Sequence, residues 1–453
     1  MAVMTVNALA ATAIAQLEAD GVDAVIGTVV NPAGLTHAKM VPVRRSNTFA
    51  DPGLGASPVW HGFAIDQTGI AFTEDISVVG DERIRIDLSA LRTIGDGLAW
   101  APGSFFDQNG VPVPTCSRGT LTRVEAALAE AGLSALVGHE IEFVLVTPDG
   151  GQLPSALWAQ YGLAGVLEYE GFVRDVTAAA TAAGVGIEQL HPEYGRNQFE
   201  ISLTPQLPVA AADQLVLARI IIGRVARKYG LRVSLSPVPF AGSVGSGAHQ
   251  HFSLSKIGIP LFSDGSGVRG MTPEGEWALA GVLSGLPEAQ GILCGSILSG
   301  LRMQPGHWAG AYACWGTENR EAALRFLLGG PGNPYGANVE VKIVDPSANP
   351  YFASAAILGL ALDGIEQKAA LPAETAVDPA TLSDDERQRA GTVRLPEDQE
   401  KTIAALDGSE RLRRILGAQA VDVLVAVRRY ERQNYADLEP EQLAEKFRMA
   451  WST

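Results

Sequence analysis

The strongest constraint on the fold is a pair of glutamates inside an apolar run, GHEIEFVLV, residues 138–146. The run reads as a β-strand, on which successive side chains point to opposite faces. Glu140 and Glu142 therefore share one face, while Ile141 and Phe143 take the other. When two such glutamates occur without companions, the face that they share is usually solvated. The chain must either expose this face or supply partners for the two carboxylates.

Further acidic and imidazole side chains are predicted on neighbouring strands. Glu193 and Glu200 flank a turn between two predicted strands, and Glu340 lies in another. His249 and His251 have the spacing that places both on one strand face, although each alone could be a hydrogen-bonded core histidine. Burying five glutamates costs too much free energy unless cations neutralise them.

The residue types favour hard divalent cations. Carboxylates are the ligands that Mg²⁺ prefers, and Mg²⁺ keeps open positions for water and phosphate oxygens. The sequence has no cysteine-rich cluster, which disfavours zinc. Two ions held by this set would suit phosphoryl transfer, in which bridging metals offset the charge of the moving phosphate.

Three arginines fit the same chemistry. Arg302 precedes a Pro-Gly turn in RMQPGHW, which ends on Trp308. Arg320 and Arg325 have an odd spacing, so both reach one site only if Arg320 lies in the loop before the strand. Forked guanidinium groups bind phosphate and carboxylate, although a structural salt bridge would explain Arg320 or Arg325 taken singly. Without a Walker loop or a GxGxxG motif, any nucleotide must be held by sheet residues, arginines and metals.

Composition narrows the class of protein. The net charge of −16 argues against nucleic-acid binding and is compatible with cationic ligands. Cys116, Cys294 and Cys314 show no pairing pattern, as expected of thiols in a reducing compartment. Residues 8–19 predict an amphipathic helix without a basic region before it, which is not typical of a signal peptide. No apolar run reaches the ~20 residues of a membrane helix. We expect a cytoplasmic protein with no membrane partner.

The chain is long enough for two domains. The first hundred residues predict a small α+β domain, with the helix followed by β-rich runs at 23–30, 35–43, 63–72 and 83–91. The Gly/Pro-rich passage 101–115 is the predicted boundary. Beyond it, a large domain with an antiparallel sheet and outer helices is expected. Its predicted helices are 120–133, 170–184, 208–230 and 348–368. Its predicted strands are 136–146, 246–254, 321–327 and 338–344, with two further strands around a turn within 187–203.

Seven motifs together resemble type I glutamine synthetases in order and spacing. They are EIE (140–142), EYGRNQFE (193–200), GSGAHQH (245–251), RMQPG (302–306), ENREAALR (318–325), VEVK (339–342) and DPSANPY (345–351). The resemblance covers nearly the whole chain and is weakest before residue 100. It implies an α+β fold with an N-terminal β-grasp domain (1–105) and a catalytic domain of the glutamine synthetase/guanido kinase type (106–453). It also implies a dodecamer of two hexameric rings, with each active site between one subunit's sheet and its neighbour's N-terminal domain.

The resemblance also implies a role for each motif residue. A first metal is held by Glu142, Glu193 and Glu200, and a second by Glu140, His249 and Glu340. ATP is bound near His251, Arg325 and Glu193, with Arg320 and Arg325 meeting the developing phosphate charge as catalytic residues. Substrate glutamate is bound by Gly245, Arg302, Lys342 and Glu142. Two or three Mg²⁺ or Mn²⁺ ions are implied, with ATP as co-substrate. The family reaction converts the side-chain carboxylate of glutamate to γ-glutamyl phosphate, from which nitrogen displaces phosphate.

Several residues depart from the family pattern. Lys342 and Asn338 stand where arginines are usual, and Val244 replaces the asparagine of an NGSG loop. Regulated members carry an adenylylated tyrosine in the segment aligned with 375–398. That segment contains no tyrosine here, so this control is predicted to be absent.

The largest departure lies at the nitrogen site. Glutamine synthetases carry a mobile glutamate after the Pro-Gly turn, where this chain has Trp308. A second acidic contact in the N-terminal domain aligns with His61. Ammonium needs anionic contacts and a base to release its lone pair. An indole instead offers its face to an alkylammonium, at about 0.5–2 kcal/mol.

These departures predict an ATP-dependent γ-glutamyl-amine ligase that resembles γ-glutamylpolyamine and γ-glutamylmonoamine synthetases. Polyamines are favoured because the chain is acidic. Two alternatives remain open: a glutamine synthetase that uses ammonium, and a non-catalytic sensor or scaffold. Trp308 could also simply pack the turn.

Overall fold

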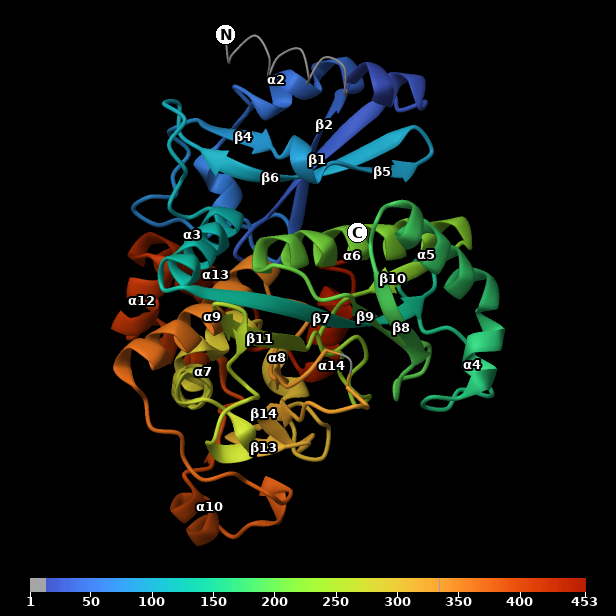
Figure 1. Cartoon of the computed structure of the whole chain (residues 1–453). Helices are drawn as coiled ribbons and strands as arrows, with labels where there is room; N and C mark the ends of the chain where they lie inside the picture. The colour runs from blue at the N-terminus through green and yellow to red at the C-terminus, as the bar shows by residue number, and fades with distance from the viewer. Residues whose placement is uncertain (1–13, 334) are drawn as a thin grey trace.

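The computed structural model describes residues 14–333 and 335–453. A six-stranded sheet near the N-terminus lies above a ten-stranded sheet, with helices between the two sheets and on the far side of the larger one (Figure 1). The α+β class expected from the sequence is confirmed. No described helix is both long and apolar enough to cross a membrane.

The N-terminal sheet has the order β2-β1-β6-β4-β3, and β5 pairs with β6. Its strands are β1 (Ala24–Val30), β2 (Thr36–Pro42), β3 (Leu54–Ala56), β4 (Glu82–Ile86), β5 (Arg92–Gly95) and β6 (Leu98–Phe106). β1 runs antiparallel to β2 and parallel to β6. Val25, Phe49, Ile84 and Phe105 are buried in its core. Residues 14–19 are helical, and the rest of the helix predicted over 8–19 lies outside the described residues.

The prediction of a strand over residues 63–72 was wrong. This segment turns back on itself, with one isolated bridge between Phe63 and Ile70. The Asp66 carboxylate accepts hydrogen bonds from the backbone nitrogens of Thr68 (3.0 Å) and Gly69 (2.7 Å). Such side-chain bonds to the local backbone compete with a strand ladder.

The run predicted over 83–91 is only partly a strand. β4 ends at Ile86, and a 3₁₀ helix follows over Leu88–Ala90. The Asp87 side chain caps this helix by accepting a hydrogen bond from the backbone nitrogen of Ser89 at 3.0 Å. As in the previous segment, an aspartate ends the extended backbone.

The larger sheet has the order β16-β13-β14-β15-β11-β7-β9-β8, with β10 paired to β7 and β12 to β11. Its strands are β7 (Leu133–Val146), β8 (Ile187–Pro192), β9 (Gln198–Leu203), β10 (Arg232–Ser234), β11 (Gln250–Lys256), β12 (Ile259–Pro260), β13 (Tyr312–Thr317), β14 (Ala322–Leu327), β15 (Asn338–Val341) and β16 (Val393–Arg394). The pairs are antiparallel, as expected, except that β13 and β14 run parallel. β7 is the longest strand and carries the glutamate pair.

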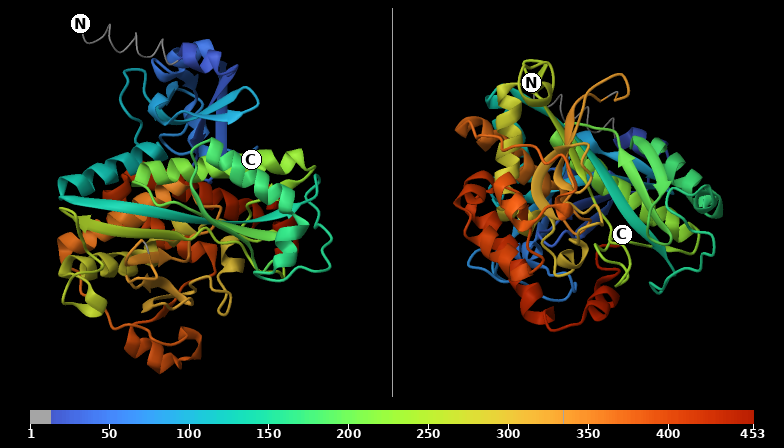
Figure 2. Two further views of the ribbon diagram at one scale, coloured as in Figure 1. Left: turned by 45° about the vertical axis from the view of Figure 1, so that its right-hand side comes forward. Right: turned by 90° about the horizontal axis from the view of Figure 1, so that it is seen from below.

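Helices cover both sides of this sheet. α3 and α6 lie between it and the N-terminal sheet, while α10 lies at the end of the molecule farthest from the N-terminal sheet (Figures 1 and 2). The helices are α2 (Ser46–Ala50), α3 (Ser117–Glu130), α4 (Leu163–Glu168), α5 (Glu170–Ala182), α6 (Pro208–Lys228), α7 (Pro273–Leu293), α8 (Ser299–Arg302), α9 (Pro350–Gln367), α10 (Asp384–Ala390), α11 (Gln399–Asp407), α12 (Glu410–Leu416), α13 (Ala418–Tyr435) and α14 (Pro440–Phe447).

The DPSANPY segment joins the N-terminal region to the large sheet. Asn349 caps α9 by accepting hydrogen bonds from the backbone nitrogens of Tyr351 (2.9 Å) and Phe352 (3.2 Å). Its side-chain nitrogen donates to the carbonyls of Val30 and Asn31, both at 3.0 Å. One buried amide therefore ends a helix and fixes the end of β1 against it.

Candidate active site

A cavity of about 730 Å³ opens on one face of the large sheet. Every catalytic-domain residue to which the resemblance assigns a site role lines it. These residues are Glu140, Glu142, Glu193, Glu200, Gly245, His249, His251, Arg302, Trp308, Arg320, Arg325, Glu340 and Lys342. Residues separated by up to 202 positions in the sequence thus share one pocket.

Strand register explains how the charged side chains meet. Glu142 on β7 lies opposite Glu200 on β9, and Glu200 lies opposite His191 on β8. On the other side of β7, His251 lies opposite Glu340 of β15. Directly opposed residues of an antiparallel pair point to the same face of the sheet. Aligned register therefore places the cluster on the face that lines the cavity.

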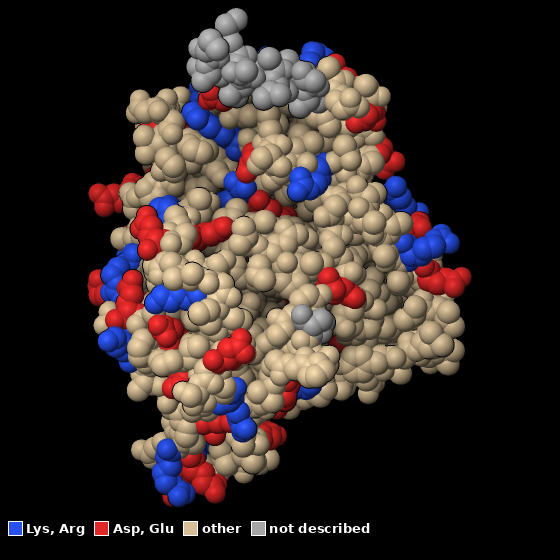
Figure 3. Space-filling model, viewed as in Figure 1, with Lys and Arg blue, Asp and Glu red and all other residues tan. Residues whose placement is uncertain are grey.

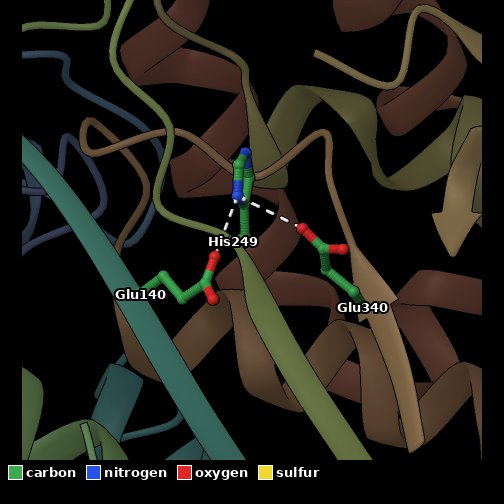
Figure 4. Close-up of side chains that lie close together, drawn as sticks. All are labelled: Glu140, His249 and Glu340. Carbon is green, nitrogen blue, oxygen red and sulfur yellow. Dashed lines mark hydrogen bonds and ion pairs between the residues drawn. The ribbon is translucent and has the colours of Figure 1, made fainter. Parts of the chain in front are cut away.

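Glu140, His249 and Glu340 form one candidate metal group (Figure 4). The His249 Nδ1 lies 3.2 Å from a Glu140 oxygen and 3.3 Å from a Glu340 oxygen. Gly247 makes room for this arrangement, because a Cβ there would lie 2.5 Å from the His249 Nε2 and 3.0 Å from Glu142. Two carboxylates and an imidazole are a suitable donor set for Mg²⁺ or Mn²⁺.

A second acidic group lies beside it. Glu142, Glu200 and His249 can offer ligand atoms to one ion, as can His191, Glu193 and Glu200. Burial raises the pKa of Glu200 well above its usual range, and the charges of Glu140 and Glu142 raise it further. A carboxylate that is costly to ionise among other carboxylates fits a site built around a cation.

His191 was not among the site residues predicted from the sequence. Its Nε2 lies 3.0 Å from a Glu193 oxygen and 3.5 Å from a Glu200 oxygen. The spacing of His191 and Glu193 is the same as that of His249 and His251, which was the available signal. Because a proline separates the pair, the alternation of a regular strand was harder to read there.

His251 carries positive charge into the cavity. Burial alone would lower its pKa, but the nearby Glu140 carboxylate, with an oxygen 3.4 Å from Nε2, raises it to about 9. Its Nδ1 lies 2.9 Å from the Asn338 side-chain oxygen. The Glu140 pKa is held well below its usual range, against the effect of burial, by hydrogen bonds with His249 and His251. The pair therefore carries opposite charges.

Arg302 lies at the end of α8 and lines the cavity beside the metal group. Its guanidinium donates to the carbonyls of Lys342 (3.1 Å) and Ile343 (3.2 Å) and lies 3.2 Å from the His249 Nε2. Lys342 directs its Nζ to a Glu340 oxygen at 2.9 Å. The lysine in the arginine position therefore already has a carboxylate partner.

Gln198 connects the metal group to the glycine loop. Its side-chain nitrogen lies 3.0 Å from a Glu142 oxygen and 2.9 Å from the Gly245 carbonyl. It is buried on β9, next to the turn of EYGRNQFE. Sequence reasoning missed it because glutamine carries no charge, which was the signal used to find the site.

Arg320 and Arg325 lie where their odd spacing led us to expect them. Arg320 is in the loop before β14 and Arg325 is within it. The Arg325 guanidinium contacts a Glu340 oxygen at 3.2 Å and a Glu318 oxygen at 2.7 Å. Arg320 stacks over the Trp308 ring, with 5.6 Å between its Cζ and the ring centroid.

Trp308 is held by its backbone rather than by burial of its ring. The buried Glu321 carboxylate accepts hydrogen bonds from the backbone nitrogens of Gly306 (3.3 Å) and Trp308 (3.1 Å). The indole is 37% exposed and contacts the Tyr194 ring edge-on at 5.4 Å. Tyr194 and Tyr161 also line the cavity, and neither was selected in the sequence.

His61 does not reach the cavity of its own chain. It is buried in the N-terminal region, with its Nε2 2.8 Å from a Glu82 oxygen and its ring 4.2 Å from that of Phe105. All residues that line the cavity, within the described ranges, follow position 139. A role for His61 remains a prediction about a neighbouring copy.

A second cavity of about 570 Å³ adjoins the first, and both are lined by Glu140 and His251. Leu136, Phe252 and Tyr335 add apolar and aromatic surface to it. The larger cavity thus has an acidic centre with a less polar extension beside it.

Comparisons with known proteins agree with this geometry. The sequence profile of the glutamine synthetase catalytic domain matches residues 114–446. Gamma-glutamylpolyamine synthetase GlnA3 of Streptomyces coelicolor is 38% identical over 97% of this chain and 96% of its own length. Glutamine synthetase of Pyrococcus abyssi is 31% identical over 73% of this chain and 74% of its own length.

A solved structure described as a novel glutamine synthase homolog superimposes with a TM-score of 0.85 and 28% identity. The alignment covers 95% of this chain and 99% of the other. Fold, motif order and site geometry lead to one conclusion. The chain belongs to the glutamine synthetase family of ATP-dependent ligases.

Proposed function

We propose that this chain joins the γ-carboxylate of glutamate to an organic amine, at the expense of ATP. The observation that carries the proposal is Trp308, which lines the cavity where the family resemblance leads us to expect a glutamate. The similarity to a γ-glutamylpolyamine synthetase over nearly the full length of both chains supports the same substrate class.

The acidic groups of the cavity suit two divalent ions, Mg²⁺ or Mn²⁺. Glu142, Glu193 and Glu200, which all line the cavity, would hold the first. Glu140, His249 and Glu340 would hold the second. When bound, such ions would offset the charge of the carboxylates and of the transferred phosphate. His191 lies close enough to Glu193 and Glu200 to join the first group. A third ion is compatible with the number of donors.

The first reaction is phosphoryl transfer. A γ-carboxylate oxygen of glutamate attacks the γ-phosphorus of ATP, and the bond to ADP breaks. Arg302 and Gly245 would position glutamate beside Glu142, with Lys342 next to them. His251, Arg320 and Arg325 would stabilise the phosphate charge. The neighbouring cavity of about 570 Å³ could receive the nucleoside end of ATP.

The second reaction forms the amide. The amine nitrogen attacks the γ-carbonyl carbon of γ-glutamyl phosphate, and inorganic phosphate leaves with the electron pair of the broken carbon–oxygen bond. An alkylamine with a pKa of about 10 is protonated at neutral pH, so a proton must be removed. Glu193 lines the cavity and could accept it, as could the leaving phosphate.

Ammonium is the less suitable nitrogen source. Trp308 places an indole after the Pro-Gly turn, and the Glu321 carboxylate beside this turn accepts two backbone hydrogen bonds. A non-catalytic sensor is disfavoured because all six metal-ligating side chains expected from the family are present in the cavity.

The test is phosphate release from Mg-ATP and glutamate, measured in parallel with spermine, putrescine, ethanolamine, ammonium and no amine. We expect at least one organic amine to exceed ammonium. Equal turnover with ammonium would contradict amine ligation, and nucleotide binding without any turnover would favour a sensor. In a second test, Trp308→Glu should raise the use of ammonium relative to amines.

A further inference from the structure

We propose that Tyr161, Tyr194 and Trp308 form an aromatic mouth that binds the carbon chain and the second positive charge of a diamine or polyamine. The inference rests on the proposed amine ligation and specifies its substrate class. It adds Tyr161 and Tyr194, for which sequence reasoning gave no role.

The three rings lie in one row at the cavity. The Trp308 and Tyr194 centroids are 5.4 Å apart, and those of Tyr194 and Tyr161 are 6.0 Å apart, both pairs in edge-on contact. All three side chains line the cavity. They come from three separate segments: the loop before α4, the turn between β8 and β9, and the loop after α8. Tertiary structure alone brings them together.

The rings remain accessible to a ligand. Tyr161 is 53% exposed, Tyr194 44% and Trp308 37%. Three adjoining aromatic side chains left half-exposed beside an acidic cavity are typical of a binding surface rather than of a core.

Two of the three rings are placed by an uncommon backbone conformation. Tyr161 has φ 55° and Trp308 φ 54°, in the left-handed region that bulky residues rarely adopt. Among the described non-glycine residues with positive φ, Trp308 is the only tryptophan and Tyr161 the only tyrosine. The Tyr161 nitrogen donates to the Pro192 carbonyl at 3.0 Å, and the Trp308 nitrogen to Glu321. Such local strain is concentrated at functional sites.

One ring already contacts a cation. The Arg320 guanidinium lies over the Trp308 indole, with 5.6 Å between its Cζ and the ring centroid. This indole face therefore attracts positive charge within the chain itself. An ammonium group at the mouth would meet the same aromatic electrons, together with those of the two tyrosines.

The inner end of the mouth is anionic. Glu193 is buried, and its carboxylate accepts a hydrogen bond from the Tyr194 backbone nitrogen at 3.1 Å. The Trp158 indole donates to the Glu193 carbonyl at 2.9 Å, which fixes this turn to the loop that carries Tyr161. A reacting amino group near Glu193 would thus send its carbon chain outward past Tyr194. A primary amine with a second, distal ammonium matches this arrangement, in which a carboxylate lies at the inner end and aromatic rings lie farther out.

The test compares putrescine with n-butylamine, which share a carbon chain and differ by the second amino group. In Tyr194→Ala and Tyr161→Ala, we expect the ratio of kcat/KM for putrescine over butylamine to fall roughly 2- to 30-fold. Tyr194→Phe, which keeps the ring, should preserve the ratio. Tyr229→Ala, at a comparably exposed tyrosine outside the cavity, is the matched control and should preserve it too.

An unchanged ratio in both alanine variants would overturn the aromatic mouth and leave amine ligation standing. Calorimetric binding of both amines in the presence of ADP provides a readout without turnover. Binding of putrescine that weakens in Tyr194→Ala, without any turnover, would support the mouth and reject the ligase. Absence of putrescine binding to the unmodified protein would reject the mouth.

Discussion

At the scale of single residues, the site is defined by charges that are stable only together. Glu200 lies among other carboxylates, and its pKa is raised by burial first and by their charges second. Glu340 instead has its pKa lowered to about 2, because Lys342 and two histidines outweigh the effect of burial. The cluster is therefore divided into a region with cationic partners from the chain and a region that needs cations from solution.

Replacing Glu200 by glutamine tests this division. The folded-state pKa of Glu200 lies above its unfolded value, so ionising it at neutral pH costs folding free energy. We expect Glu200→Gln to raise the Tm of the metal-free protein and to reduce the increase in Tm on adding Mg²⁺. Calorimetry with and without a chelator measures both. Glu130→Gln, at an exposed position, is the control, and an undiminished response to Mg²⁺ would contradict the assignment.

A histidine in the N-terminal sheet gives a pH-dependent prediction. Burial lowers the pKa of His37 from 6.5 to about 4, beside the rings of Trp60 and Phe63. Since the folded state resists protonation, its contribution to stability is complete above pH 6.5 and is lost as the pH falls toward 4. Between pH 6.5 and about pH 5 the loss should reach about 2 kcal/mol.

His37→Phe keeps a ring in this place but cannot be protonated. Urea unfolding of the variant at the two pH values should show a smaller loss than the unmodified protein. An identical loss in both proteins would assign the acid sensitivity to other groups.

At the scale of elements, the strands position the site and the loops complete it. Register across β8, β9, β7, β11 and β15 aligns the charged residues on one face. Arg320 and Trp308 reach the same cavity from loops at its edge. Four of the six candidate metal ligands thus lie on strands, and Glu193 and His249 lie directly beside a strand end. The proposed amine contacts lie on loops, which vary more readily in sequence.

The cap of α9 is the element whose loss should be most costly. Asn349→Ala removes the two hydrogen bonds that cap α9 and the two that Asn349 donates to the end of β1, although the Val30 and Asn31 carbonyls each keep one other donor. We expect a loss of roughly 2 to 4 kcal/mol in the free energy of unfolding, measured by denaturant titration. Ser383→Ala removes the cap of the exposed helix α10 and should cost about 1 kcal/mol. Equal losses in the two variants would show that the bonds to β1 contribute nothing.

At the scale of the whole molecule, the predicted assembly shares each active site between two subunits. The described residues that line the cavity all follow position 139, while Phe72, Val78 and Val79 of the N-terminal region expose apolar side chains. In the predicted dodecamer, an N-terminal domain would complete the next subunit's site.

Mass measurement tests the assembly. Twelve chains of 47.6 kDa give a particle of about 570 kDa, which light scattering after size exclusion would detect. A fully active monomer would contradict an active site shared between subunits.

The distribution of charge is also a property of the whole molecule. Apart from the grey atoms, acidic and basic side chains are interspersed over the face in Figure 3. The net charge of −16 gives general attraction for polycations, but it does not by itself place one. In the proposed function, the acidic cavity and its aromatic mouth would provide the specific location.

The amino-acid sequence alone determined the family, the elements that carry the motifs and most of the charged residues of the cavity. It did so because burying carboxylates in apolar strands costs free energy unless cations neutralise them. Alternation along a strand also predicts which side chains share a face. It failed at residues 63–72, where Asp66 binds its own backbone and stops the strand.

Only the tertiary structure brought Tyr161 and Tyr194 to Trp308, Gln198 to Glu142, and Glu321 to the backbone after the Pro-Gly turn. These contacts join loops and strands that are remote in sequence and carry no charge pattern or periodicity of their own. It also kept His61 away from the cavity of its own chain. Which side chains meet across a pocket depends on strand register and loop geometry, and neither is encoded by the spacing of residues within one segment.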